Sequence, residues 1–206
     1  MIAINQLTYQ YRGESKLTFP DLVATDNHCM ITGESGAGKT TLLHLLAGLI
    51  SPASGSITYS STRFTELSAQ QQQTFRNQHL AVAPQEPAFI AALRMKEYLR
   101  LIGEQSNGRM PDAVDEILEE LQINRLTNKK PHQLSGGEKQ RFGLVVALMQ
   151  QPSFLLVDEP TSSLDQTHAQ RVMDCLMKQA QRLNFQMVVV SHDARIAHHF
   201  KQTIAL

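Results

Sequence analysis

The sequence predicts an α/β fold with a mostly parallel sheet core and an inserted helical subdomain, and three observations lead to this prediction. Short apolar runs of strand length alternate with helical patterns along much of the chain. The block between residues 95 and 150 contains helical patterns but no convincing strand. A glycine-rich segment joins one apolar run directly to a helical pattern. Strands that alternate with helices are typical of a parallel sheet covered on both faces.

Each expected element follows from its local pattern. The expected strands are Ile2–Leu7, His28–Thr32, Ser56–Tyr59, Leu80–Ala83, Phe154–Asp158 and Met187–Ser191. The helices that alternate with them are Lys39–Leu49, Gln166–Leu183 and Asp193–Phe200. The block without strands is expected to hold the helices Met95–Ile102, Pro111–Leu121 and Gly136–Gln150. The run Gln70–Gln73 is expected to form a polar helix or turn.

Composition limits the classes of function. The chain has 206 residues, which suits one domain. Nineteen basic residues balance nineteen acidic ones, so no overall field favours nucleic acid or an anionic membrane. Cys29 and Cys175 form no CxxC pair and are expected to be reduced core thiols. The N-terminus lacks a secretory pattern and no apolar run is long enough to cross a bilayer, so any channel is expected from another chain.

A phosphate-binding loop is the strongest single motif. Residues 33 to 40 match G-x-x-x-x-G-K-[ST] between an apolar strand and a helix. The backbone N–H groups and the helix start converge on phosphate oxygens, Lys39 reaches the β- and γ-phosphates, and Thr40 offers its hydroxyl to Mg²⁺. The alternative is a glycine-rich turn with a solvated lysine, although chance produces this pattern in on the order of one chain in a hundred. The expected nucleotide contacts are Gly33, Glu34, Ser35, Gly36, Ala37, Gly38, Lys39, Thr40 and Thr41.

Two adjacent carboxylates end the apolar run that begins at Phe154. Asp158 is positioned to hold Mg²⁺, and Glu159 to orient or deprotonate a water that attacks the γ-phosphate. The alternative is that this acidic pair only caps the following helix. A phosphate loop in the same sheet favours the catalytic interpretation, because ligands collect at the carboxyl ends of parallel strands.

The segment Leu134–Arg141, with the sequence LSGGEKQR, distinguishes between families that share a phosphate loop. It resembles the signature LSGGQ of the ABC ATPase family, with Glu138 where Gln is commonest. The hydroxyl of Ser135, the backbone N–H groups of Gly136 and Gly137, and the helix that starts there form a second anion site. The resemblance implies that Ser135 and Gly137 of one subunit close over the γ-phosphate that a second subunit holds. The alternative is a Gly-Gly helix start with a purely structural purpose.

Further motifs of that family occur in the expected order. Gln85 matches the glutamine loop that contacts Mg²⁺ or water, Asp165 the D-loop acid that acts across a dimer interface, and His192 the switch histidine at the γ-phosphate. Tyr11 aligns with the aromatic residue that stacks on adenine, and Tyr9 is the competing choice. Gln85, Asp165 and His192 also have simpler interpretations, as a loop amide, a helix N-cap and a strand-end histidine respectively. The resemblance covers nearly the whole chain.

The chain departs from the family in two places. Asp26-Asn27 replaces the customary Gly-Glu turn, and the segment before the phosphate loop is short, which affects the expected N-terminal sheet and adenine contact. The run Gly143–Leu148 lacks the usual arginine. The segment Val190–Asp193 is faintly similar to cassettes of the lipoprotein-release and macrolide-export type, and no substrate is inferred from it.

The resemblance implies a P-loop NTPase ABC cassette with N-terminal antiparallel strands. Residues 1–206 then form one ATP-binding domain, with an α/β core of residues 1–85 and 151–206 and a helical subdomain of residues 86–150. The implied function is that of an ATP-hydrolysing subunit that binds ATP and Mg²⁺ and drives a transporter. Its implied partners are a second cassette, identical or paired, and transmembrane permease subunits. It would lie on the cytoplasmic face of the cell membrane.

Three other interpretations remain at this stage. A soluble ABC ATPase that is not coupled to transport is the main alternative, although long coiled-coil insertions and a second cassette are absent from the sequence. A small-molecule kinase leaves LSGGEKQR unexplained. A regulatory cassette that hardly hydrolyses ATP is disfavoured by the presence of both Glu159 and His192.

Overall fold

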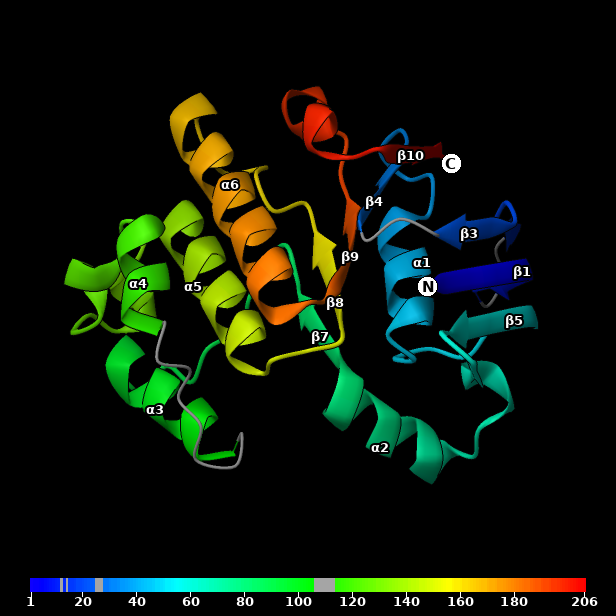
Figure 1. The fold of residues 1–206 in the computed structure, drawn as a ribbon, viewed down its shortest axis with the longest axis horizontal. Helices are drawn as coiled ribbons and strands as arrows, with labels where there is room; N and C mark the ends of the chain where they lie inside the picture. The colour runs from blue at the N-terminus through cyan, green and yellow to red at the C-terminus, as the bar shows by residue number, and fades with distance from the viewer. Residues whose placement is uncertain (12, 14, 25–27, 106–113) are drawn as a thin grey trace.

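The computed structural model describes residues 1–11, 13, 15–24, 28–105 and 114–206. These residues form two five-stranded sheets with helices between and around them (Figure 1). The expected α/β architecture is confirmed. Pro111, the expected start of one helix, and Asp26-Asn27 lie outside the described residues.

The first sheet is antiparallel and contains the N-terminus. Its long strand β1 (Ile2–Gln10) pairs with β2 (Lys16–Thr18), β3 (Leu22–Ala24) and β5 (Ser54–Tyr59), and β5 pairs with β6 (Thr62–Arg63). Helix α2 (Ala69–His79) follows and leads into the second sheet. The expected N-terminal antiparallel strands are therefore present.

The second sheet is parallel and has the strand order β10-β4-β9-β8-β7. Its strands are β4 (His28–Thr32), β7 (Leu80–Ala83), β8 (Phe154–Asp158), β9 (Gln186–Val190) and β10 (Gln202–Ala205). After β4 the chain enters this sheet again at β7 on the far edge, returns through β8 to β9 beside β4, and ends with β10 on the other side of β4. The strand order therefore switches next to β4, which the phosphate loop follows.

Alternate side chains of the central strands point to opposite faces of the parallel sheet. Leu156 and Val188 belong to the hydrophobic cluster that contains α1 (Lys39–Leu46) and the antiparallel sheet. Leu155 and Val189 belong to the cluster that contains α5 (Gly136–Met149) and α6 (Gln166–Leu183). Figure 1 shows the sheet between α1 and α6. Burial on both faces explains why β8 and β9 are continuous apolar runs.

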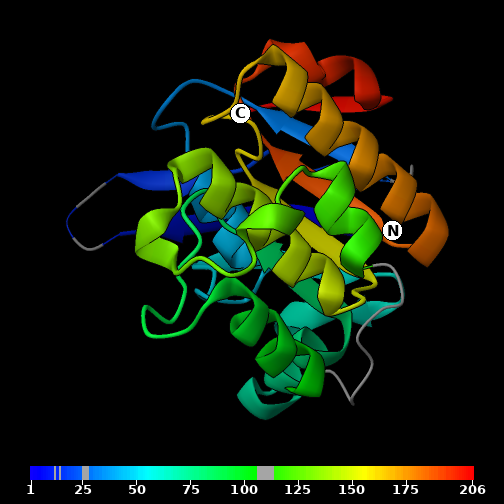
Figure 2. The ribbon, with the colours of Figure 1, turned by 90° about the vertical axis from the view of Figure 1, so that its left-hand side faces the viewer.

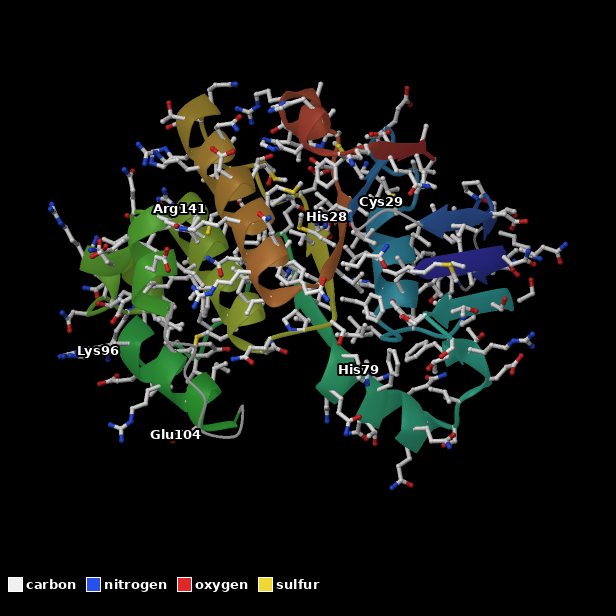
Figure 3. All side chains as sticks on the ribbon, viewed as in Figure 1. His28, Cys29, His79, Lys96, Glu104 and Arg141 are labelled. Atoms are coloured by element: carbon white, nitrogen blue, oxygen red, sulfur yellow. The ribbon has the colours of Figure 1, made fainter. Side chains whose placement is uncertain are left out.

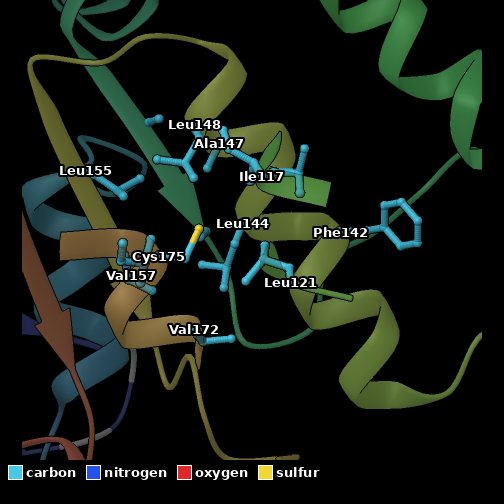
Figure 4. Packing of buried hydrophobic residues seen from close by; sticks show 14 of the residues in the cluster. Ile117, Leu121, Phe142, Leu144, Ala147, Leu148, Leu155, Val157, Val172 and Cys175 are labelled. Carbon is cyan, nitrogen blue, oxygen red and sulfur yellow. The ribbon is translucent and has the colours of Figure 1, made fainter. Parts of the chain in front are cut away.

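A helical layer packs beside α6 and consists of α3 (Met95–Gln105), α4 (Val114–Glu120) and α5, as Figure 2 shows from the side. Ile117 and Leu121 pack toward Leu144 of α5 in a fully buried group (Figure 4). At the surface, Lys178 of α6 pairs with Glu116 at 2.7 Å and with Glu120. The helical layer therefore shares one hydrophobic cluster with the sheet.

Both cysteines are free and buried, as expected. Cys29 lies in β4, inside the molecule (Figure 3), and Cys175 lies among Leu144 and Val157 (Figure 4). Burial raises the pKa of the Cys29 thiol to about 12. A thiol with so high a pKa stays protonated at neutral pH and is a poor nucleophile. In the described ranges, every helix is too short or too polar to cross a membrane.

Several expected boundaries were wrong. Helix α1 ends at Leu46 rather than Leu49, because Gly48 adopts a left-handed φ of 63°. The expected helix Asp193–Phe200 is a 3-10 helix, η4 (Ala194–His199), in which Asp193 is the N-cap. Strand β9 runs from Gln186 to Val190 and not from Met187 to Ser191. The expectation of a polar helix or turn at Gln70–Gln73 is confirmed, because this run lies in α2, where Ser68 and Gln71 form a capping box.

Candidate active site

The candidate site lies at the carboxyl ends of the parallel strands. The phosphate loop follows β4, the acidic pair ends β8, His192 follows β9 and Gln85 follows β7. Because the strands are parallel and adjacent, these segments meet at one edge of the sheet. A cavity of about 650 Å³ opens there, and it is lined by Glu34, Ser35, Gly36, Gly38, Lys39, Thr40, Thr41, Gln85, Glu159 and His192.

The phosphate loop has the backbone geometry of an anion cradle. Gly38, the N-cap of α1, has a φ of 91°, and a Cβ there would lie 3.3 Å from Leu17 and Phe19 side chains. Only glycine adopts this conformation without strain. The ammonium group of Lys39 donates to the carbonyl oxygens of Gly33 and Glu34 at 2.9 and 2.8 Å. The lysine therefore spans the loop, with its charge held where phosphate oxygens would bind.

Thr40, which lines the cavity, forms a hydrogen-bonded pair with Asp158, which does not line it. The Thr40 hydroxyl donates to Asp158 Oδ2 at 3.0 Å. Asp158 is 5% exposed, and its Oδ1 has no hydrogen-bond partner among the described residues. Burial raises the pKa of this carboxyl above its ordinary value, and the Thr40 hydrogen bond opposes the rise. A buried carboxylate with an unpartnered oxygen beside a hydroxyl suits a hard divalent cation, so these residues fit Mg²⁺.

The carboxylate of Glu159 is held by the segment that follows β9. Ser191 Oγ donates to Oε2 at 2.8 Å. The backbone N–H of His192 lies 3.2 Å from Oε1, and the His192 ring nitrogen Nδ1 lies 2.7 Å from the same oxygen. Glu159 is buried, whereas the His192 side chain is 67% exposed and borders the cavity. The Glu159 carboxylate is therefore held by Ser191 and His192, while the His192 imidazole is exposed at the cavity.

Glu159 also has an unusual backbone conformation. Its φ is 44°, in the left-handed region that residues with a Cβ adopt at a cost of about 1–3 kcal/mol. The backbone N–H donates to the carbonyl oxygen of Val190 at 2.8 Å, which ties the residue to β9. Such strain persists where surrounding contacts determine the conformation, and it gathers at functional positions.

Asp193 connects the histidine segment to the loop after Glu159. Thr161 Oγ1 donates to Asp193 Oδ2 at 2.6 Å, and Arg195 donates to both carboxylate oxygens at 2.8 and 2.7 Å. The Arg195 hydrogen bond, helped by that from Thr161, lowers the pKa of Asp193 to about 2. Arg195 also reaches the carbonyl oxygen of Leu164 at 3.4 Å. The two loops thus form one hydrogen-bonded unit.

The signature segment lies at the start of α5 and does not line the cavity. Ser135 is the N-cap of α5, and its hydroxyl accepts from the Glu138 N–H at 3.2 Å while Glu138 Oε2 accepts from the Ser135 N–H at 2.7 Å. Glu138 in place of glutamine preserves this capping box. A Cβ on Gly137 would lie 2.8 Å from Leu164 Cδ2, so the start of α5 packs closely on the residues just before Asp165. No signature residue is among the described residues that line the cavity.

The remaining expected residues surround the site. Tyr11 is 40% exposed, and its hydroxyl lies 2.9 Å from Thr41 Oγ1, whereas Tyr9 packs against the hydrophobic cluster under the antiparallel sheet. Asp165 is the N-cap of α6 and accepts from the His168 N–H at 2.9 Å. Gln85 Nε2 lies 3.5 Å from Ser162 Oγ. The cavity thus gathers most of the expected residues but leaves out Gly33, Ala37, Tyr11, Ser135, Gly136, Gly137, Asp158 and Asp165.

Ser191 and Gln140 contact Glu159, although the sequence did not point to either residue. Ser191 was expected to end a strand, but its side chain binds the Glu159 carboxylate. Gln140 was only part of the signature string, but its side-chain amide donates to the Glu159 carbonyl oxygen at 2.6 Å. Gln140 stands among the polar residues Glu138, Lys139 and Arg141, so no local pattern marked it; only its burial in the structure, at 3% exposed, shows that it needs a partner.

The cradle, its lysine and the acid pair at the end of a neighbouring strand define a P-loop nucleoside triphosphatase. Residues 22–162 match the family model described as ABC transporter. The chain is 37% identical over 180 residues to the lipoprotein-releasing system ATP-binding protein LolD of Legionella pneumophila (strain Lens), which covers 85% of this chain and 79% of that protein. It is 34% identical over 184 residues to the putative hemin import ATP-binding protein HrtA of Staphylococcus saprophyticus, with 86% and 81% covered.

Solved structures agree with the sequence relatives. The dimeric structure of MJ0796, a bacterial ABC transporter cassette, matches with a TM-score of 0.88 and 28% identity over 100% of this chain and 94% of that one. A dimeric post-hydrolysis state of the same cassette, bound to ADP and Pi, matches with a TM-score of 0.87, 27% identity and the same coverage. This chain belongs to the ABC transporter family and is an ATP-binding and ATP-hydrolysing subunit.

Proposed function

We propose that two copies of this cassette, or one copy and a related cassette, close around two ATP molecules and thereby drive a membrane transporter. One observation carries the proposal. The cavity is lined by most of the phosphate loop and by the carboxylate proposed to orient water, but no signature residue of the same chain lines it. The anion-binding helix start at Ser135 is left to serve a second subunit. The dimeric cassettes among the solved structures support this arrangement.

Each residue at the cavity has a proposed task. The loop 33–41 binds the phosphates through its backbone N–H groups, with Lys39 as the countercharge. Thr40 and Asp158, with Gln85, would hold Mg²⁺, which when bound neutralises charge on the phosphates. Tyr11 would stack on adenine.

Glu159 is the proposed base. Its carboxylate accepts hydrogen bonds from Ser191 and His192 on one side, and Glu159 and His192 both line the cavity. It would orient the attacking water and accept its proton, while the exposed His192 contacts the γ-phosphate. In the second subunit, Ser135, Gly136 and Gly137 bind the γ-phosphate from the opposite side and Asp165 crosses the interface.

ATP binding then favours the closed dimer, and hydrolysis allows it to open. We propose residues 1–85 and 151–206 as the core, residues 86–150 as the subdomain that contacts permease subunits, and the cytoplasmic face of the membrane as the location. The balance of nineteen basic and nineteen acidic residues favours these partners over nucleic acid. The relatives' names mention lipoprotein release and hemin import, so the proposal assigns no cargo.

The test compares two glutamate variants. Glu159→Gln keeps the size of the side chain but removes the base, so we expect ATP to bind with nearly wild-type affinity while steady-state hydrolysis falls at least about a hundredfold. Glu138→Gln is the matched control, because glutamine also completes the capping box and hydrolysis should persist. Wild-type hydrolysis by Glu159→Gln would contradict the assigned role.

A further inference from the structure

The side chain of Gln140 is buried at the point where the signature helix meets the catalytic loop. Gln140 lies in the second turn of α5 and is 3% exposed. Its Nε2 donates to the carbonyl oxygen of Glu159 at 2.6 Å and lies 3.4 Å from Ser162 Oγ. Its Oε1 has no partner within the described part of the chain. The buried amide is therefore hydrogen-bonded through its nitrogen only, to the carbonyl oxygen of Glu159 and to Ser162 Oγ.

These contacts converge on one atom, the carbonyl oxygen of Glu159. Besides Gln140, Ser162 Oγ donates to it at 3.2 Å. The φ of 44° at Glu159 sets the direction of its side chain, because the Cα–Cβ bond turns with the backbone. If the residue relaxed to an ordinary conformation, the carboxylate would leave Ser191 and His192. The donors to this carbonyl oxygen thus help to hold the strained geometry.

We propose that Gln140 is a positioning residue for ATP hydrolysis, which acts by fixing the backbone of Glu159 and not by touching the nucleotide. This inference rests on the proposed role of Glu159 as the base. Helix α5 begins at Ser135, so the same rigid helix carries the signature at its tip and the Glu159 restraint in its second turn. Engagement of Ser135 by a second subunit's nucleotide would then act on an element that directly contacts the catalytic residue of its own chain.

The test replaces the amide with an apolar side chain of similar length. Gln140→Met removes the donor, and we expect kcat to fall about tenfold or more while the KM for ATP changes less than about twofold, because only the base is misplaced. The matched control is Gln179→Met. Gln179 is 1% exposed on α6, its Nε2 also lacks a described partner, and it does not line the cavity. This variant changes a buried glutamine but should leave kcat unchanged.

Two further measurements make the outcome decisive. In the Glu159→Gln background, Gln140→Met should cause no additional loss, since both changes remove the same function. Ser162→Ala, which removes the second side-chain donor from an exposed position, should lower kcat several-fold and serves if Gln140→Met does not fold. A wild-type kcat for Gln140→Met, or for Ser162→Ala in its place, would overturn the inference, as would an equal loss of kcat in Gln179→Met.

The proposed function fails separately. If Glu159→Gln hydrolyses ATP at the wild-type rate, the base is misassigned and the inference falls with it. If Glu159→Gln is inactive but Gln140→Met is fully active, only the positioning role is wrong.

Discussion

Replacing Asp193 tests how firmly the histidine segment is tied to the loop after Glu159. Asp193→Asn keeps the shape of the side chain but removes the charge that Arg195 and Thr161 bind. The Asp193 side chain is 9% exposed, whereas that of Arg195 is 36% exposed, so solvent screens the ion pair in part. The folded pKa of Asp193 is about 2 against an ordinary 3.8. That gap corresponds to at most about 2 kcal/mol of stability at neutral pH, since one pKa unit equals about 1.4 kcal/mol.

The pH dependence gives the sign of the effect. Because the folded pKa of Asp193 is below its unfolded value, the stabilisation is complete above about pH 4 and is lost as the pH falls through 2. The free energy of unfolding should therefore differ between wild type and Asp193→Asn by at most about 2 kcal/mol at pH 7 and pH 5, and by about half of that difference at pH 3.

Urea unfolding followed by circular dichroism at these three pH values measures the difference. Asp115→Asn, at an exposed position on α4, controls for the loss of one negative charge and should change stability by less than about 0.5 kcal/mol. A difference for Asp193→Asn that does not shrink between pH 5 and pH 3 would refute the ionic origin of the effect. Equal stability at pH 7 would refute the contact itself.

Three other changes have definite expected outcomes. Gly143→Ala should lower the melting temperature by about 2–4 °C in spite of better helix propensity, because the new Cβ would lie 2.8 Å from Pro87; a rise would show that Pro87 moves away freely. Asp158→Asn should raise the melting temperature of the nucleotide-free protein, because it removes a buried carboxylate with an unpartnered oxygen. In a thermal-shift assay it should also abolish the extra stabilisation that Mg²⁺ gives to the ATP-bound protein. If Mg²⁺ stabilises the variant as much as the wild type, Asp158 does not belong to the metal site. Tyr11→Ala should weaken ATP binding about tenfold in calorimetry, whereas Tyr9→Ala should mainly lower stability; the reverse pattern would transfer the adenine contact to Tyr9.

Local sequence patterns predicted the parts of the fold that depend on neighbouring residues. The strands His28–Thr32, Leu80–Ala83 and Phe154–Asp158 have the expected boundaries, because fully buried parallel strands are continuous apolar runs. The phosphate loop was also evident, since its backbone conformation requires glycine at set positions.

The short strands could not be predicted in the same way. Strands β2, β3 and β6 have two or three residues each, which is too short for a periodic pattern, and β10 alternates at the edge of its sheet. β2 and β6 pair with strands that are close in sequence, β1 and β5. The pairing of β3 with β1, and above all of β10 with β4, joins segments that are farther apart along the chain. Tertiary contacts of this kind are not written in local composition.

The catalytic centre was predictable in its residue types but not in its supports. An acid pair after an apolar strand predicted Asp158 and Glu159 at the sheet edge. No local pattern predicted the left-handed backbone of Glu159, because the side chains that contact this residue include Gln140 and Ser191 on other segments. A strained conformation held by distant contacts is the kind of feature that local propensity does not report.

Mixing two inactive variants tests the shared site most directly. Lys39→Ala disables the phosphate cradle and Ser135→Arg blocks the signature helix start, so neither protein alone should hydrolyse ATP. A dimer of one copy of each would contain one intact site, built from the cradle of one copy and the signature of the other. We predict that an equimolar mixture recovers up to about a quarter of the wild-type rate, the value for random pairing. A mixture as inactive as its components, under conditions in which the wild type hydrolyses ATP, would contradict a nucleotide site shared between copies.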